Sequence, residues 1–388
     1  MNFQFGGGGD WLSWIAWFVF MMVFFLFYPR IMLSQIMWKL EKTAEELEDM
    51  AESSKKFIIK SISKKAEKRI KEAVTRFFEF FVITPVSLDP YGIIRKLDHI
   101  IKEEKDRFEY FVDQVAPDFD SEKKACLRMG LAGGISVYEI SKVVRHYVEL
   151  VRKTKNIQIA MVLQMQLPMI ERIAKAMFKG TQTLAKGEPV GDGIGPLIAA
   201  YLMGNKKPTI EEDDVVGVKT KIEGRNVFVL KAKGPGGRTG FPGKVVKKLV
   251  EKNGVKRIIT IDAAAKLEGE KTGSVAEGVG VAMGGVGVER SYIEEAIVKK
   301  GVAIDSVIVK MSQEEAITPM KKTIKDALPE VVEAVKRGLE RVGKNGSAIV
   351  LGVGNTSGIG NSRKEAEKAM KWVDKYHKRV SAKKKSRI

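Results

Sequence analysis

The most apolar stretch of the chain comes near its start, where no residue between Asp10 and Arg30 carries a charge. Residues Trp11 to Tyr28 are apolar apart from Ser13. As a helix rising about 1.5 Å per residue, this run would reach roughly 27 Å, close to the thickness of the hydrocarbon layer of a bilayer. Three tryptophans lie near one end of the run and Tyr28 at the other, as aromatic residues do at membrane interfaces. The pattern predicts one membrane-spanning helix.

Basic residues flank this run on one side only. No Lys or Arg precedes it, whereas Arg30, Lys39 and Lys42 follow it. The positive-inside rule then places the short N-terminus outside the cell and everything after Arg30 in the cytoplasm. A cleaved signal peptide would need a basic leader and a small-residue cleavage site, and neither is present. We therefore expect a single-pass protein of the cell membrane.

A seven-residue apolar repeat follows the predicted span. Leu33, Leu40 and Leu47 recur at this spacing with further apolar residues between them, which is typical of a coiled coil of about three heptads. The stripe would either pair two copies of the chain or pack on a downstream helix of the same chain. We expect the helix to continue from Ser53 to Arg76 with a basic outer face, which would lie either on anionic lipid or in solvent.

The next part of the chain keeps a helical period up to a change of composition near Gly187. Within it, the run from Ile157 to Ile170 is nearly all apolar, but its glutamines and Pro168 favour a buried helix over a second span. The predicted parts are a tail and membrane helix (1–29), a basic coiled-coil-like stalk (30–83), a helical domain (84–186), a glycine-rich α/β domain (187–362) and a basic helix with its tail (363–388).

After Gly187, glycine becomes frequent and short β-branched runs alternate with helical ones. This alternation predicts a mixed, largely parallel sheet between helices. The expected strands are residues 215–222, 227–232, 257–261, 305–310 and 348–353, with a hairpin connection at 224–226. The expected helices are residues 197–203, 243–253 and 289–300, with one or two more helices within residues 319–342.

The run from Arg257 to Ile261 is the most informative strand of this domain. Its bulky residues show no polar alternation, which is typical of a parallel strand covered by helices on both faces. Ligands and reacting groups in open α/β sheets gather beyond the carboxyl ends of such strands. Asp262 stands at that end and is a candidate site residue; the alternative is a turn residue that bonds its own backbone.

Four glycine-rich loops lie in the same domain, at residues 191–196, 233–244, 278–287 and 352–360. The second is not a nucleotide-binding P-loop, because Arg238 stands at a required glycine and Val245 at the required Ser or Thr. Exposed N–H groups together with Arg238 and Lys244 would bind an anion; the alternative is a set of turns that need positive φ. The predicted anion-binding residues are Gly236, Gly237, Arg238, Lys244, Gly284, Gly285, Gly354, Asn355 and Thr356.

Charge adds a prediction about partners. Lys and Arg exceed Asp and Glu by 19, and residues 363–388 alone hold eleven Lys or Arg against three acids. Such a surplus predicts anionic lipid or nucleic acid as partners, although the tail would serve equally as a solubilising terminus. The chain has one cysteine and three histidines that lie far apart, so the sequence predicts no metal site and identifies no cofactor.

Two resemblances follow from these features. The whole chain, with its N-terminal anchor and glycine-rich C-terminal half, resembles an uncharacterised family of archaeal membrane proteins, which implies a membrane location and an archaeal origin. Gly191-Asp192-Gly193-Ile194-Gly195-Pro196 resembles the acid-x-x-Gly-Pro turn of the spore-protein and hydrogenase-maturation endopeptidases. Ile261-Asp262-Ala263-Ala264-Ala265 is similar to the strand end that carries a second acid in the spore family.

The order of these motifs differs from that of the endopeptidases. Their Gly-Leu-Gly-Asn segment directly precedes the first acid, whereas the similar Gly352-Val353-Gly354-Asn355 lies near the far end of this chain. Either the domain is circularly permuted or the likeness is accidental. The resemblance implies a phosphorylase/hydrolase-type α/β sandwich. The metal-binding histidine of the hydrogenase-maturation relatives has no evident counterpart.

The resemblance also implies a shared site for Asp192 and Asp262. Two nearby carboxylates would hold one proton near neutral pH, so that one activates water while the other donates to a carbonyl. The alternative is two structural acids, Asp192 before a helix and Asp262 in a turn. The functional hypotheses are therefore a membrane-anchored hydrolase of the aspartate-dependent peptidase type, or a non-enzymatic tether that recruits nucleic acid or acidic partners through basic surfaces.

Overall fold

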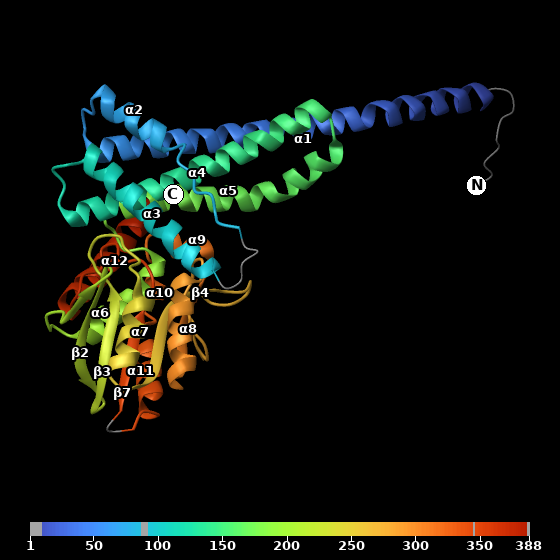
Figure 1. Ribbon diagram of the computed structural model, residues 1–388. Helices are drawn as coiled ribbons and strands as arrows, with labels where there is room; N and C mark the ends of the chain where they lie inside the picture. Colours follow the sequence, from blue (N-terminus) through green and yellow to red (C-terminus); the bar gives the residue numbers. More distant parts are fainter. Residues whose placement is uncertain (1–9, 87–91, 344–345, 386–388) are drawn as a thin grey trace, which may run out of the picture. The chain divides into compact units, whose positions relative to one another are not determined.

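The computed structural model describes residues 10–86, 92–343 and 346–385. The glycine run 6–9, residues 87–91 of the expected helical domain and the last residues of the basic tail, 386–388, lie outside the described residues. Contacts divide the chain into two compact units: Met1–Glu52 with Val137–Ala174, and Ser53–Ser136 with Lys175–Ile388. Figure 1 shows the helices and strands of both units.

The N-terminal half is helical, as expected. Its elements are α1 (Asp10–Ile62), α2 (Lys68–Phe77), α3 (Ile93–Val115), α4 (Ser121–Thr154) and α5 (Ile157–Ala185). The helix expected to continue to Arg76 instead ends at Ile62. The Ser61 hydroxyl donates to the Phe57 carbonyl, and the Ser63 hydroxyl accepts the Lys65 N–H. Serine side chains that bond local backbone groups compete with helical hydrogen bonds, which explains the break.

In the first unit, the leucine repeat of α1 packs against α4 and α5 of the same chain. Leu40, Ala44 and Leu47 are fully buried and share one core cluster with Val148 and Leu167. Arg145 of α4 adds ion pairs to Glu41 and Glu48 of α1, with 2.6 Å between the Arg145 Nε and a Glu48 oxygen. Of the two alternatives for the repeat, the structure shows packing on downstream helices.

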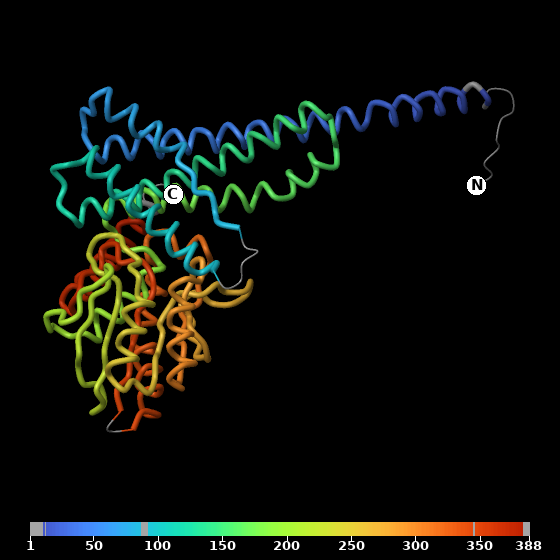
Figure 2. The backbone as a smooth tube through the Cα atoms, viewed as in Figure 1, coloured from blue at the N-terminus to red at the C-terminus, as the bar shows by residue number. Residues whose placement is uncertain are grey.

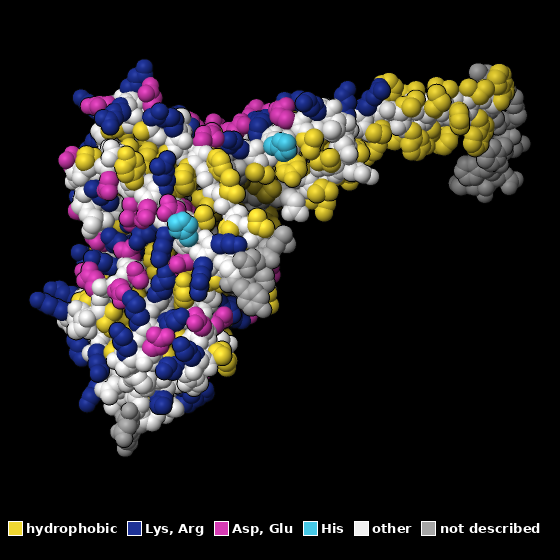
Figure 3. Space-filling view, viewed as in Figure 1, with side chains coloured by type: hydrophobic (Ala, Val, Ile, Leu, Met, Phe, Trp, Pro, Cys, Tyr) yellow, Lys and Arg dark blue, Asp and Glu magenta, His cyan; other side chains and the backbone are white. Residues whose placement is uncertain are grey.

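The first part of α1 carries exposed apolar side chains. Within the described residues, α1 is the helix that is long and apolar enough to cross a membrane. Trp14, Phe18, Phe25 and Tyr28 are all at least half exposed, and Figure 3 shows hydrophobic side chains covering this part of the helix. A water-exposed surface of this kind is unfavourable in solution and favourable in lipid.

The interpretation of residues 157–170 as a buried helix is only half right. Ala160, Leu163 and Leu167 of α5 are buried, whereas Met165 is 77% exposed and Met169 is 52% exposed. In this unit, the buried face of α5 packs with α1 and α4 in one cluster, so the opposite face stays open. The glutamines and Pro168 did not distinguish full burial from one-sided packing.

The α/β fold class is confirmed: the second half forms a sheet of seven strands, largely parallel at its centre. Its strands are β1 (Ile210–Glu212), β2 (Val215–Ile222), β3 (Arg225–Ala232), β4 (Val255–Ala265), β5 (Val275–Gly278), β6 (Ala303–Met311) and β7 (Ser347–Gly352). Their order in the sheet is β1-β2-β3-β7-β4-β6-β5. The pairs β3·β7, β7·β4 and β4·β6 are parallel, and the outer pairs are antiparallel.

Helices cover both faces of this sheet (Figure 1). The remaining elements are η1 (Gly191–Gly193), α6 (Ile194–Met203), α7 (Pro242–Lys252), α8 (Val288–Lys300), α9 (Gln313–Ile317), α10 (Lys322–Lys325), α11 (Leu328–Glu340) and α12 (Arg363–Lys385). One core cluster joins α6, α11 and α12 to the sheet, and a second joins α7 and α8 to it. The trace in Figure 2 shows β3 beside β7, although they are far apart in sequence.

Two short strands were not predicted. β1 and β5 lie at the two ends of the strand order, and their side chains are exposed or only partly buried. Edge strands of this kind have no buried apolar run, so the hydrophobic pattern does not mark them. The predicted strand 257–261 is correct but longer in the structure, where β4 extends to Ala265 through its pairing with β6.

Candidate functional site

The candidate site lies at the carboxyl edge of the central strands. Ile261 of β4 is paired with Gly352 of β7, and beyond this pair the Val353 N–H donates to the Ile261 carbonyl over 2.8 Å. The first turn of α6 rests on the same edge, because a Cβ at Gly195 would lie 2.5 Å from the Ile261 carbonyl oxygen. The glycines of the 191–196 segment therefore allow η1 and α6 to approach the ends of β4 and β7.

Asp262 lies inside β4 rather than in a turn. It is paired with Ile308 of β6, and it is only 6% exposed. Its Oδ1 accepts the Ala263 N–H over 2.7 Å. The alternative is wrong about the turn, because the strand continues for three residues past Asp262, but right that Asp262 bonds neighbouring backbone.

Asp192 lies in η1, directly before α6. Its Oδ2 accepts the Asn355 N–H over 2.8 Å, and it does not cap either helix. Gly354 makes this contact possible, because its φ is +128° and a side chain there would collide with the Asp192 carbonyl. The expected role of Asp192 as a helix cap is thus not what the structure shows; its carboxylate instead bonds the loop after β7.

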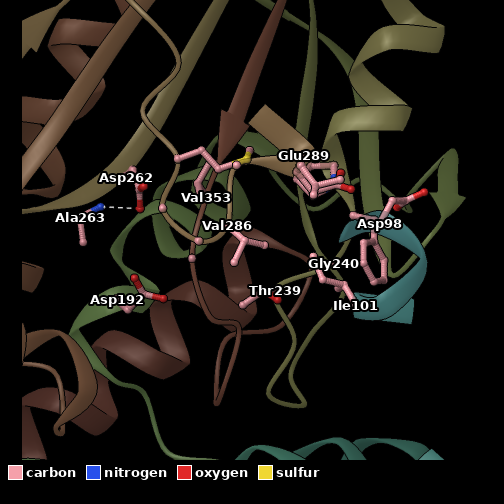
Figure 4. A pocket seen from close by; sticks show the side chains of 18 residues that line it. Asp98, Ile101, Asp192, Thr239, Gly240, Asp262, Ala263, Val286, Glu289 and Val353 are labelled. Carbon is pink, nitrogen blue, oxygen red and sulfur yellow. Dashed lines mark hydrogen bonds between the residues drawn. The ribbon is translucent and has the colours of Figure 1, made fainter. Parts of the chain in front are cut away.

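Both aspartates line one cavity of about 370 Å³, which we call the aspartate cavity. Pockets of roughly 300–1,000 Å³ are typical of small-ligand and substrate sites. Its walls come from α3, the loop before α7, the glycine-rich loop before α8 and the loop after β7. Figure 4 shows Asp192 and Asp262 at one end of the cavity and Asp98 and Glu289 at the other.

Burial perturbs both carboxyl groups, and the charge of Asp192 adds to the effect on Asp262. Burial raises the pKa of Asp192, opposed by the hydrogen bond from Asn355. Burial first, and then the charge of Asp192, raise the pKa of Asp262 to about 7, opposed by the N–H groups of Ala263 and Gly284. Asp262 therefore keeps its proton to a higher pH than a solvated aspartate does, because the buried site and the neighbouring carboxylate both disfavour its charged form.

The far end of the cavity holds two acids that the sequence did not single out. Asp98 of α3 pairs with Lys244 over 2.8 Å and also accepts the Tyr292 hydroxyl. Glu289 of α8 accepts the Gly243 N–H through Oε2, and its Oε1 is buried without a hydrogen-bond partner among the described residues. Burial raises the pKa of Glu289. Glu289 comes two residues after the end of a glycine-rich loop, which is a usable signal in the sequence, whereas nothing local marks Asp98.

The predicted anion-binding residues divide between two places. Gly284, Gly285 and Gly354 line the aspartate cavity. Arg238 instead pairs with Glu122 over 2.8 Å, and Thr356 is fully buried, where its hydroxyl donates to the Gly236 carbonyl. The remaining predicted residues take structural contacts of the same kind: Gly237 packs on Met129, Asn355 donates to Asp192, and Lys244 pairs with Asp98.

These contacts occupy the cationic side chains of the loops with carboxylates of the same chain. Among the described residues that line the aspartate cavity, none is Lys or Arg. In the described ranges, no three His, Cys, Asp or Glu side chains are grouped so as to hold a metal ion. Anion binding by these loops stays a prediction, and the chemistry that the cavity itself presents is that of paired carboxyl groups.

Comparisons with known proteins give a family and no further relatives. Neither the curated proteins nor the solved structures contain a match. Two family models match successive parts of the chain: the N-terminal domain of a protein of unknown function (DUF1512) matches residues 14–187, and its C-terminal domain matches residues 190–360. The second match contains both aspartates and all four glycine-rich loops, whereas Asp98 of α3 lies in the first match. The chain belongs to the DUF1512 family and carries both of its domains.

Proposed function

We propose that this protein is a membrane-anchored hydrolase whose α/β domain cleaves peptide bonds with the aspartates 192 and 262. One observation carries the proposal: two carboxyl groups from separate elements line one cavity at the carboxyl edge of a parallel sheet, where burial and then the charge of Asp192 raise the pKa of Asp262. Strongly perturbed acids in a cavity are common at catalytic sites.

The chemistry follows from the shared proton. At neutral pH one carboxyl group is ionised and takes a proton from a water molecule, which then attacks the substrate carbonyl. The other is protonated and donates to the carbonyl oxygen as negative charge develops there. Burial of Asp262, which is 6% exposed, keeps this group from ionising in the way that a solvated aspartate would.

The position of the loop after β7 supports the permuted endopeptidase interpretation. Gly352–Asn355 comes near the end of the chain, yet the Asn355 N–H bonds the Asp192 carboxylate. In space, this loop thus adjoins the first acid, as its counterpart does along the sequence of the endopeptidases. An accidental likeness would not require the three motifs to meet at one cavity. The separate resemblance of the whole chain to a family of archaeal membrane proteins supports an archaeal origin, which is part of the proposal.

The membrane anchor is part of the proposal. The exposed apolar segment from Trp11 to Tyr28 supports a single span. Arg30, Lys39 and Lys42 after the span support a cytoplasmic α/β domain and a short outer N-terminus by the positive-inside rule. A tethered peptidase would act on chains that reach it near the inner membrane surface.

Peptide cleavage by the full chain in detergent micelles tests the proposal. A mixed peptide library is incubated with the wild type, Asp192→Asn and Asp262→Asn, and new termini are identified by mass spectrometry. Asp106→Asn is the matched control, because Asp106 is exposed on α3 and lies outside the cavity. We expect loss of turnover by at least about 10³-fold in the two site variants and none in the control. Equal cleavage by all four proteins refutes the assignment.

A non-enzymatic tether is the second candidate, and the charge surplus of 19 favours it. α12 packs on the core through Ala366, Ala369 and Val373, while most of its Lys and Arg side chains are exposed. Such a surface would bind nucleic acid or anionic lipid by releasing counterions. Binding to RNA or anionic vesicles that collapses between 50 and 200 mM salt, without any Asp-dependent turnover, would favour the tether.

A further inference from the structure

A second compartment adjoins the aspartate cavity. It has a volume of about 280 Å³ and lies between α3, α4 and the loop before α7; we call it the α3–α4 compartment. Ile101, Thr239, Gly240 and Phe241 line both spaces. The two spaces therefore adjoin each other along the Thr239–Phe241 loop.

The interior of the α3–α4 compartment is largely apolar. Its apolar lining consists of Ile101, Phe108, Met129, Ala132 and Phe241. Phe108 is 9% exposed and also forms part of the aromatic cluster with Phe77 and Phe80, so this wall is fixed. Covering such a surface with an apolar group is favourable by roughly 25 cal/mol per Å² removed from water.

The cations of this compartment are already paired. Lys105 lies 2.6 Å from a carboxylate oxygen of Asp214. Arg238 lies 2.8 Å from Glu122, and Arg128 pairs with Glu109. A phosphate or carboxylate ligand would have to displace these carboxylates, so the three basic residues do not make an anion site.

Glu104 is the remaining charged residue of the lining. It is half-buried, and within the described residues it has neither an ion pair nor a hydrogen bond. Burial raises its pKa, as expected for a carboxylate without a donor. A backbone N–H of a bound peptide would supply the donor that this acceptor lacks.

We propose that the α3–α4 compartment is a substrate subsite that binds a large apolar side chain of a polypeptide, next to the bond presented to Asp192 and Asp262. The inference rests on the proposed function, which it extends to substrate preference. Three features favour this occupant: the compartment adjoins the aspartate cavity, its lining is apolar, and its cations are already paired. Helix α3 would then belong to both spaces, with Asp98 and Ile101 at one and Phe108 at the other.

Filling the compartment tests this inference. Ala132 is only partly buried and lines it from α4, so Ala132→Phe places a ring in the space without touching either aspartate. Val143→Phe is the control, because Val143 is 55% exposed on the same helix and lies outside the compartment. Cleavage by the full chain in micelles is measured on two peptide series that differ at a single position. One series carries Leu or Phe at that position, and the other carries Ala.

We expect Ala132→Phe to raise KM for the Leu and Phe peptides on the order of tenfold or more, while kcat for these peptides stays within about twofold of the wild-type value. For the Ala peptides, both KM and kcat should stay within about twofold of the wild-type values. Met129→Ala, which enlarges the space, should favour the Phe peptides over the Leu peptides. Turnover with unchanged KM in Ala132→Phe, or an equal loss for both series, overturns the subsite. A wild type that cleaves none of the peptides overturns the proposed function itself, and the subsite with it.

Discussion

Replacing Asp262 by asparagine should remove activity and yet stabilise the protein above neutral pH. The pKa of Asp262 rises from an ordinary 3.8 to about 7, chiefly through burial and then through the charge of Asp192. Each unit of pKa corresponds to about 1.4 kcal/mol, so ionising Asp262 in the folded protein costs roughly 4 kcal/mol at pH 8. Asparagine carries no charge and keeps an oxygen that can accept the Ala263 N–H.

The sign of the pH dependence follows from the raised pKa. Between about pH 4 and pH 7 the folded protein retains a proton that the unfolded chain has released. This stabilisation is complete below pH 4 and is lost as the pH rises through 7. The gain from Asp262→Asn should therefore be near zero at pH 4 and reach its maximum, at most about 4 kcal/mol, above pH 7.

Urea unfolding in detergent micelles at pH 4 and pH 8 measures this difference. Trp372 packs against the main core of the α/β domain, whereas the other four tryptophans lie in α1. A background with phenylalanine at those four positions lets the fluorescence of Trp372 report the α/β domain alone. Asp106→Asn serves as the control and should change nothing. A gain that is equal at both pH values, or a loss at pH 8, would refute the buried-charge argument.

Three further changes test other parts of the structure. Gly354→Ala should lower the free energy of unfolding of the α/β domain by about 1–3 kcal/mol in urea and stop turnover, because φ at this position is +128° and the new methyl group meets the Asp192 carbonyl. A variant with wild-type stability and turnover would show that this contact is not tight. Leu47→Ala should lower the free energy of unfolding of the α1–α4–α5 core by about 2–5 kcal/mol, since Leu47 is fully buried, while Glu45→Ala, at an exposed site, should have little effect. Burial lowers the pKa of Lys231 to about 7. The free energy of unfolding of the wild type should therefore rise between pH 7 and pH 10, because the unfolded chain loses there the proton that the folded chain has already released. Lys231→Met should flatten this rise, and an unchanged slope would contradict the argument.

The strand that carries Asp262 was predictable because its cause is local. A continuous run of bulky residues from Arg257 to Ile261 is what burial on both faces requires. The same rule about carboxyl ends pointed to the correct edge of the sheet. Its exact end was not predictable, because β4 continues past Asp262 only by pairing with β6.

The composition of the aspartate cavity was only partly predictable. Its glycine loops and two aspartates stand in recognisable local motifs, but Asp98 comes from α3, a helix of the other sequence domain. The contact between Asn355 and Asp192 joins residues 163 positions apart. Only the folded chain brings such groups together, and the sequence pattern near Asp98 is that of an ordinary amphipathic helix.

The basic residues of the loops show a different limit of sequence reasoning. Arg238 and Lys244 stand beside glycines in a pattern typical of anion sites. In the structure, Glu122 and Asp98 of two other helices neutralise them. A sequence shows where charges are placed, whereas their ion-pair partners depend on tertiary packing.

The pH dependence of peptide cleavage by the full chain tests the central claim most directly. If Asp192 and Asp262 share a catalytic proton, kcat/KM should fall tenfold per pH unit above the pKa of Asp262, about 7. The value of kcat/KM should also fall at low pH, once both groups are protonated. Asp262→Asn should show no cleavage at any pH. A rate that stays constant through pH 7 to 9, or cleavage retained by Asp262→Asn, would contradict the shared-proton mechanism.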